Sequence, residues 1–156
     1  MKLYNLLNED MILFSLAGRT RDEALREMVE FLKKNGRITK EKDLLEKLLQ
    51  REKLGSTAIG DGVAIPHGKV KGLKNPVVMA AISRPGVDFD SLDGNPTNVF
   101  FLVISSPDNP SINLQILAAI AQLVRKSTAL PQKLMKAPDA KTLLEILRKE
   151  EEALGD

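Results

Sequence analysis

The stretch VVMAAISRPGVDFDSLDGNPTNVFFLVISS, residues 77–106, decides the fold class of this chain. Near its two ends, residues 77–82 and 99–104 are apolar at every position. Strands that are apolar throughout are typical of a sheet covered on both faces. The two runs therefore predict two buried strands. Between them, RPG predicts a turn, and the alternation at Val87 and Phe89 predicts a short separate strand.

A helical pattern precedes these strands in TRDEALREMVEFLKKNG, residues 20–36. Thr20 and Glu23 have the spacing of a capping box, and Gly36 follows the last apolar position. Five apolar residues recur at helical spacing and predict the buried face: Ala24, Leu25, Met28, Val29 and Leu32.

Further elements follow from the same reasoning. A second helix is expected to begin near Thr39 and to end before Gly55, with a leucine stripe at 44, 45, 48 and 49. A long helix is expected over about 111–125, and shorter ones over 130–136 and 139–150, whereas 12–16 predict a short strand and 55–76 a loop. Mixed helices and covered strands predict an α/β fold, a single domain over residues 1–156 with a mixed parallel/antiparallel sheet flanked by helices. The strand order is not predicted.

Composition excludes several classes of function. The chain has 156 residues, with 23 Lys and Arg against 21 Asp and Glu, so charge gives no general reason to bind nucleic acid or a membrane surface. Cysteine is absent and histidine occurs once, which argues against a metal site and fits a reducing cytoplasm. The longest apolar runs are about six residues, where a membrane span needs about 20. We expect a cytoplasmic protein without metal, cofactor, nucleic-acid partner or membrane insertion.

Two loop motifs in the chain are incomplete. Gly55 and Gly60 have the glycine spacing of a phosphate-binding P-loop, but Asp61 stands where that loop needs lysine and would repel a triphosphate. The acidic stretch DFDSLDG, residues 88–94, resembles a calcium loop, but Asp93 comes one position late and the twelfth position is Val99. Tight turns and a solvated loop explain both stretches better.

A third candidate is a serine–histidine–aspartate arrangement from Ser56, Asp61 and His67. No Gly-x-Ser-x-Gly sequence is present, and closeness in sequence is poor evidence for a triad, which is defined by geometry in space.

His67, in GDGVAIPHGKV (60–70), is the most informative single residue. One interpretation is a lone histidine on a turn, satisfied by a backbone carbonyl. The other is a nucleophile, because Pro66 restrains the backbone before it and Gly68 allows a ligand to approach closely. Neutral imidazole is a good nucleophile near neutral pH, so such a site suits a group that is received and passed on.

The longer segment LLQREKLGSTAIGDGVAIPHGKV, residues 48–70, resembles the active-site segment of a known family. This is the fructose/mannitol-type (type 2) enzyme IIA family of the bacterial phosphotransferase system, which includes the nitrogen-regulatory enzyme IIA. The resemblance spans about residues 5–147 and rests on a specific ordered pattern: Arg51-Glu52, Gly55, Thr57, Gly60, Gly62 and Ile65-Pro66-His67-Gly68.

The resemblance implies that His67 accepts a phosphoryl group from the phosphocarrier protein HPr or a homologue. The group then passes to a cysteine of an enzyme IIB partner and on to sugar. In the nitrogen-type branch, the phosphorylation state instead controls binding to other, regulatory target proteins. The sequence leaves both roles open, together with the sugar, the oligomeric state and the imidazole nitrogen that is used.

The same resemblance suggests the residues that hold phosphate. Arg51 can make paired hydrogen bonds to phosphate oxygens, or it can form an ion pair with Glu52. Ser56 and Thr57 can donate from their hydroxyls or can cap a turn. The family carries a second histidine after the PDN turn, and Asn113 occupies that position here, with a neutral amide that has no titration near neutral pH.

Overall fold

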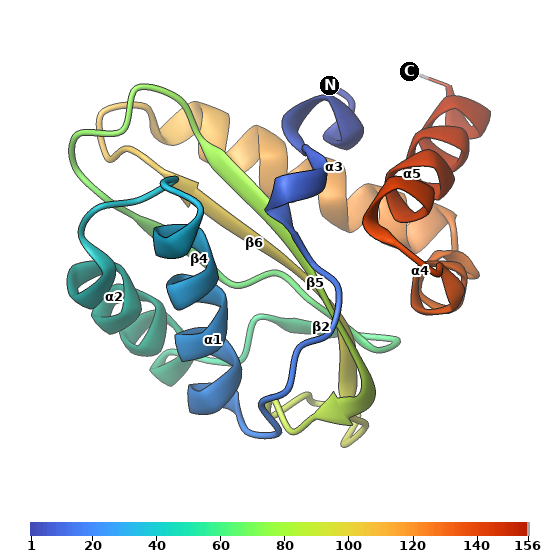
Figure 1. The fold of residues 1–156 in the computed structure, drawn as a ribbon, viewed down its shortest axis with the longest axis horizontal. Coiled ribbons are helices and arrows are strands. Elements are labelled where there is room, and N and C mark those ends of the chain that lie inside the picture. The colour runs from blue at the N-terminus through green and yellow to red at the C-terminus, as the bar shows by residue number, and fades with distance from the viewer. Residues whose placement is uncertain (156) are drawn as a thin grey trace.

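The sheet is built around β5 (Val77–Val87) and β6 (Thr97–Ser105), which pair antiparallel in a register that joins Val77 to Ile104 and Ile82 to Val99. A computed structural model describes residues 1–155, so the predicted domain, 1–156, ends one residue outside the described part (Figure 1). The two predicted core strands are confirmed.

The remaining strands are short and lie on both sides of this pair. β1 (Ile12–Leu13) runs parallel to β5. β3 (Val63–Ala64) and β4 (His67–Lys69) both run parallel to β6, one after the other along the same side of it, and β2 (Ala58–Gly60) pairs antiparallel with β3. The order β1-β5-β6-β3-β2, with β4 also on β6, makes the sheet mixed, as predicted.

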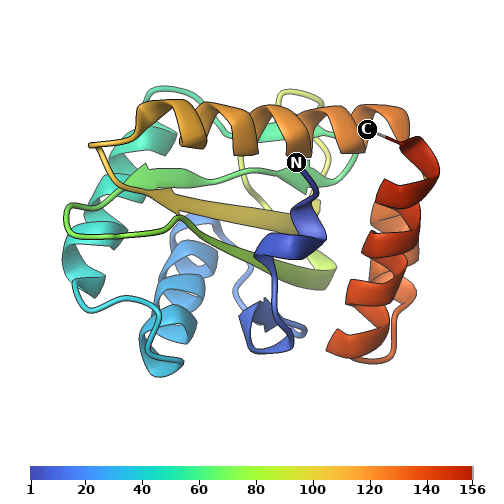
Figure 2. The ribbon, with the colours of Figure 1, turned by 90° about the horizontal axis from the view of Figure 1, so that it is seen from above.

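Helices cover both faces of this sheet, which explains why the β5 and β6 core is apolar on both sides. α3 lies on one face, while α1 and α2 lie on the other, and α4 and α5 stand at one end (Figure 2). The bounds are α1 Arg21–Lys34, α2 Glu41–Lys53, α3 Pro110–Lys126, α4 Leu130–Lys136 and α5 Ala140–Leu154, with short 3₁₀ helices at Leu3–Leu6 and Glu9–Met11.

The predicted helices are present, and α1, α3 and α5 begin with side-chain caps from Thr20, Asn109 and Asp139. Thr20 accepts a hydrogen bond from the Glu23 amide, and the Glu23 side chain reaches back to the Thr20 amide, so the capping box is present. All five residues of the predicted apolar face of α1 are buried. α2 begins at Glu41, slightly later than predicted, and α5 extends four residues beyond residue 150 to Leu154.

The predicted turn at RPG is wrong. β5 continues through Pro85 and Gly86 to Val87, and its register against β6 shifts between Ile82 and Val87, as in a β-bulge. The bulge accommodates the positive φ of Gly86 (92°) and leaves Pro85, which has no amide hydrogen, outside the regular ladder, so the strand continues. The separate short strand expected around Val87 and Phe89 is absent from the described residues: Val87 ends β5, Asp88 makes only an isolated bridge to Thr20, and Phe89 lies outside the strands.

The predicted loop over residues 55–76 contains the three short strands β2, β3 and β4. Asp61 and Gly62 connect β2 to β3 with φ of 56° and 79°, the positive values that a two-residue hairpin turn requires. Pro66 lies between β3 and β4, and its carbonyl accepts the Val103 amide at 2.9 Å. The proline has no amide hydrogen to donate, which an edge position tolerates. His67 consequently begins a strand and does not lie on a turn.

Candidate functional site

His67 is half-buried at the start of β4, where it pairs with Val103 of β6. Its Nδ1 lies 2.9 Å from the carbonyl oxygen of Ile65. A carbonyl oxygen only accepts hydrogen bonds, so this contact requires the proton on Nδ1. Nε2 then carries the free lone pair. The backbone-carbonyl contact that the sequence suggested as a structural role is present, and it leaves the second nitrogen available.

Arg51 faces that second nitrogen from the last turn of α2. Its Nε donates to His67 Nε2 at 3.3 Å, and its Nη1 donates to the Gly55 carbonyl at 2.8 Å. Because a guanidinium only donates, this contact independently places the lone pair on Nε2. Arg51 has no carboxylate partner in residues 1–155, so the alternative of an ion pair with Glu52 is not what the structure contains.

Gly68 explains how the end of α2 reaches the histidine. A Cβ atom at Gly68 would lie 3.3 Å from Leu48 Cδ2 and 3.8 Å from Leu44 Cδ1, both on α2. A glycine at this position therefore lets α2 pack closely on β4. The prediction assigned this glycine to the approach of a ligand, whereas its close neighbour in the structure is a helix.

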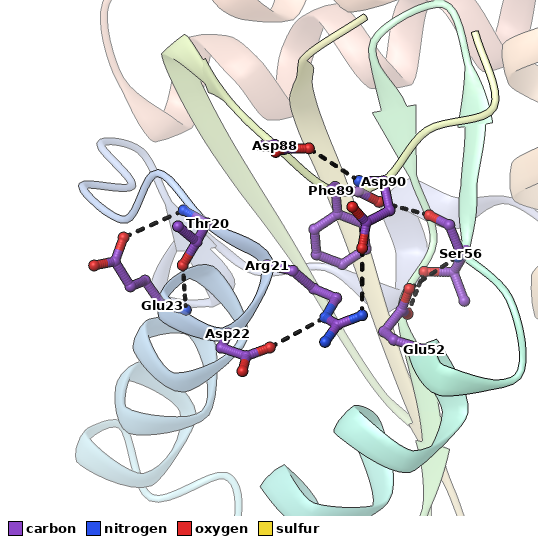
Figure 3. Close-up of polar contacts among 10 residues, drawn as sticks. Thr20, Arg21, Asp22, Glu23, Glu52, Ser56, Asp88, Phe89 and Asp90 are labelled. Atoms are coloured by element: carbon purple, nitrogen blue, oxygen red, sulfur yellow. Dashed lines mark hydrogen bonds and ion pairs between the residues drawn. The ribbon is translucent and has the colours of Figure 1, made fainter. Parts of the chain in front are cut away.

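Ser56 and Thr57 lie in the turn after α2, and both hydroxyls have partners within the protein. Ser56 Oγ donates to the Phe89 carbonyl at 2.6 Å, the contact drawn in Figure 3, and accepts the Ala58 amide. Thr57 Oγ1 donates to Glu52 Oε2 at 2.6 Å. In this arrangement the two hydroxyls hold the turn. Their predicted part in binding phosphate stays a prediction.

The acidic loop at 88–94 is organised by its own side chains. Asp90 pairs with Arg21 of α1 at 3.3 Å and its amide donates to Asp88 (Figure 3). Asp93 accepts hydrogen bonds from the Ser91 hydroxyl and the Asn95 amide, and the Ser91 contact is the main reason that its pKa is lowered. Within residues 1–155, no three His, Cys, Asp or Glu side chains are grouped to hold a metal.

The possible triad is not assembled in the structure. The proton of the Ser56 hydroxyl goes to the Phe89 carbonyl, and both ring nitrogens of His67 contact other groups.

Asn113 lies in the first turn of α3, the helix that packs on β6. Its exposed fraction is 6%, and its Oδ1 is buried without a hydrogen-bond partner among residues 1–155. No hydrogen bond joins Asn113 to His67 in the described residues. Its predicted part in phosphate binding stays a prediction.

Sequence reasoning missed the function of Glu52 at this site. Its exposed fraction is 4%, and it accepts both the Thr57 amide and the Thr57 hydroxyl. A signal was available, because Glu52 continues the spacing of Leu44 and Leu48 along the buried face of α2. A carboxylate on an apolar face is rarely buried without a partner.

Comparison with known proteins identifies the family of the chain. The family model described as phosphoenolpyruvate-dependent sugar phosphotransferase system, EIIA 2, matches residues 5–150. The chain belongs to this family. Membership gives it the role of a phosphocarrier component of that system and confirms the resemblance drawn from residues 48–70.

Individual relatives come from two branches of the EIIA family. A nitrogen regulatory protein of Bradyrhizobium diazoefficiens is 37% identical over 94% of this chain and 95% of its own length. A fructose-specific EIIABC component of Bacillus subtilis is 30% identical over 94% of this chain, which spans only 23% of that longer protein. The crystal structure of nitrogen regulatory protein IIA-Ntr from Neisseria meningitidis has a TM-score of 0.83 at 28% identity, covering 93% of this chain and 98% of that one. Such relatives have the α/β fold seen here. None of the helices in residues 1–155 has the length and apolarity needed to cross a bilayer.

Proposed function

We propose that the EIIA protein accepts a phosphoryl group on Nε2 of His67 and passes it to a second protein. One observation carries the proposal: Nδ1 is bound to the Ile65 carbonyl, while Nε2 presents its lone pair beside the Arg51 guanidinium. The nucleophile is therefore held in one tautomer, next to a cation suited to phosphate oxygens. We also propose that residues 1–156 form a single domain.

The chemistry needs no proton transfer at His67. The Nε2 lone pair attacks phosphorus in the phosphohistidine of the donor, and the donor N–P bond breaks with its electrons returning to the donor imidazole. His67 becomes a phosphoimidazolium whose Nδ1 proton still points at the Ile65 carbonyl. When an acceptor thiolate attacks the phosphorus, the electron pair of the N–P bond returns to Nε2, and the starting tautomer is restored.

Arg51 supplies the electrostatic part of this mechanism. Phosphoryl transfer relies on positioning and charge stabilisation more than on covalent work by the protein. Once Nε2 is bonded to phosphorus, it no longer accepts from Arg51 Nε, whose N–H can then donate to a phosphoryl oxygen while Nη1 stays on the Gly55 carbonyl. Ser56, Thr57 and Asn113 complete the proposed phosphate-binding set if their side chains turn toward the group.

The proposed donor is HPr or a homologue, and the proposed acceptor is a cysteine of an enzyme IIB protein in sugar uptake. The acceptor must come from another protein or region, because this sequence contains no cysteine. The B. subtilis relative supports this choice, since its name combines EIIA with B and C components. We place the exchange in the cytoplasm, where a free thiol stays reduced.

A second role has its own support. The B. diazoefficiens relative, which matches along nearly its whole length, is a nitrogen regulatory protein. In that role, phosphorylation of His67 would control binding to regulatory target proteins. The two roles differ in the acceptor. Rapid loss of the phosphoryl group to an enzyme IIB cysteine favours sugar uptake, and a long-lived phosphoprotein with altered target binding favours regulation.

The direct test combines the protein with phosphoenolpyruvate, enzyme I and HPr, followed by intact mass measurement. We expect one acid-labile phosphoryl group on the wild-type protein and none on His67→Ala. Circular dichroism on the variant serves as the folding control. Equal labelling of a folded His67→Ala variant would overturn the proposal.

A further inference from the structure

We propose that Glu52 is a positioning residue. By binding Thr57 it holds the groups that contact the two ring nitrogens of His67, the Ile65 carbonyl at Nδ1 and Arg51 at Nε2. The inference deepens the proposed function and rests on it for its kinetic consequences. Among the described residues no hydrogen bond joins Glu52 to His67. Both carboxylate oxygens of Glu52 bind one residue: Oε1 accepts the Thr57 amide at 2.9 Å, and Oε2 accepts the Thr57 hydroxyl at 2.6 Å.

From Thr57, one chain of hydrogen bonds leads to the Nδ1 side of the imidazole. The Thr57 carbonyl accepts the Ile65 amide at 3.0 Å. The Ile65 carbonyl in turn accepts the Nδ1 proton of His67 at 2.9 Å. Holding Thr57 thus holds the peptide whose carbonyl selects the tautomer of the nucleophile.

A second chain leads to the Nε2 side. The turn from Glu52 to Thr57 contains Gly55, which has a φ of +146°. Glycine adopts many backbone conformations readily, so other contacts must hold the turn in this one. The Gly55 amide donates to the Glu52 carbonyl at 3.1 Å, and the Gly55 carbonyl accepts from Arg51 Nη1 at 2.8 Å. Closing this turn through Glu52 and Thr57 fixes the carbonyl that orients the guanidinium against Nε2.

The two chains meet at His67 and form a closed ring of contacts that starts and ends at the Glu52–Thr57 pair. The pair is buried, with Glu52 at 4% and Thr57 at 6% exposed, so water competes little for its hydrogen bonds. In this inference Thr57 acts by holding the backbone, which is an alternative to the phosphate contact proposed above for its hydroxyl. These two roles give opposite results when Glu52 is changed.

The test reads the tautomer of His67 by ¹⁵N NMR on the unphosphorylated protein, at a pH where the imidazole is neutral. The chain has one histidine, so the spectrum contains one imidazole. We expect the wild-type protein to show the proton on Nδ1. In Glu52→Ala, the population with the proton on Nε2 should rise several-fold. This measurement needs no phosphoryl donor. An unchanged tautomer in Glu52→Ala would therefore contradict the role of Glu52 without contradicting phosphorylation of His67, and absent phosphorylation would contradict the proposed function without changing the tautomer result.

The conservative variant Glu52→Gln distinguishes hydrogen bonding from charge. Its amide oxygen can accept the Thr57 amide, while its NH₂ group donates to the rotated Thr57 hydroxyl. We expect this variant to keep the wild-type tautomer. The matched control is Glu151→Ala, which removes another buried carboxylate. Glu151 lies on α5, at the other end of the molecule from α2 (Figure 1), and accepts the Leu3 and Tyr4 amides. The control variant should lower stability and leave the tautomer unchanged.

Rates of phosphorylation by HPr complete the test. Small misplacement of reacting groups costs up to about 10²-fold in rate, so Glu52→Ala should be slowed about 10- to 100-fold, with Glu52→Gln near wild type. The proposal is overturned if folded Glu52→Ala keeps the Nδ1 proton, or if Glu151→Ala shifts the tautomer equally. It is also overturned if Thr57→Val slows transfer while Glu52→Ala does not, because the hydroxyl would then act on phosphate directly.

Discussion

Arg51 makes two different contacts with one side chain, and this decides what a substitution should do. Its Nε faces His67 while its Nη1 is anchored on the Gly55 carbonyl. Lysine keeps the charge but has a single ammonium group in place of a planar fork. Arg51→Lys should therefore slow phosphoryl transfer from HPr about tenfold or more and leave HPr binding unchanged.

Stopped-flow transfer rates and a separate binding titration check this expectation. An unchanged transfer rate in Arg51→Lys would show that the guanidinium is a surface charge without a part in transfer.

The buried side chain of Asn113 lowers the stability of the folded protein, and a hydrophobic residue would remove this effect. Its Oδ1 is buried and accepts no hydrogen bond from the described part of the chain, and an unsatisfied buried polar atom costs about 1–3 kcal/mol. Asn113→Leu, of similar volume, should raise the free energy of unfolding by about 1 kcal/mol. If Asn113 also donates to phosphate, as proposed, the same variant should transfer more slowly. Urea unfolding measures the first effect, and a decrease in stability would contradict it.

The sequence predicts the nucleophile and the cation of the site but not their arrangement. His67 is recognisable because it is the single histidine, in a specific motif with Arg51. From the sequence, Glu52 is predicted only as a possible ion partner of Arg51, because its hydrogen bonds to Thr57 depend on how the turn closes. The tautomer depends on the Ile65 carbonyl, which lies between β3 and β4 in a peptide whose amide binds the Thr57 carbonyl, an arrangement that residue types alone do not predict.

Among the elements, β5 depends most on one glycine. Gly86 has a φ of +92°, and a Cβ atom there would lie 2.7 Å from Pro96 Cβ. Gly86→Ala should therefore lower the free energy of unfolding by about 3 kcal/mol, from backbone strain together with the clash. Gly94→Ala is the matched control. Gly94 has a φ of +74°, and a Cβ atom there would have no described atom within 4 Å, so this substitution should lower the free energy of unfolding by only about 1 kcal/mol.

Thermal and urea unfolding of both glycine variants check the difference. Equal losses in the two variants would show that the bulge in β5 tolerates a side chain.

The elements that could be predicted are those with strong local signals. Capping residues and apolar stripes gave the helices, and continuous apolar runs gave β5 and β6. β2, β3 and β4 have two or three residues each and many glycines and prolines, so no local pattern predicts them. β3 and β4 are strands because β6, distant in sequence, offers an edge to pair with, and β2 is a strand because it pairs with β3. Pro85 and Gly86 likewise indicate a turn locally, and pairing with β6 overrides that preference.

For the whole molecule, several carboxyl groups have lowered pKa values, each because a hydrogen bond favours the charged form. The main donors are the Arg19 amide for Glu23, Ser91 for Asp93, Thr142 for Asp139, Arg148 for Glu145 and Lys133 for Glu150. In the acidic range, the unfolded chain therefore binds more protons than the native protein, and stability rises with pH.

The free energy of unfolding should accordingly fall as the pH drops from about 5 toward 3, through the lowered pKa values of the native carboxyls. Urea unfolding at a series of pH values measures it. Glu150→Gln should weaken the dependence, because it removes the carboxyl held by Lys133 and Ser127. A free energy of unfolding that stays constant or rises toward acid pH would contradict the assignment.

The fold as a whole brings α2, the β3–β4 edge and the intervening turn to one place, and the account of function depends on what this does to His67. The most direct measurement is heteronuclear NMR of the ¹⁵N-histidine-labelled protein after phosphorylation by HPr. The account predicts phosphorus bonded to Nε2 and the proton retained on Nδ1, against the Ile65 carbonyl. Phosphorus bonded to Nδ1, or a phosphoryl group on any residue other than His67, would contradict it.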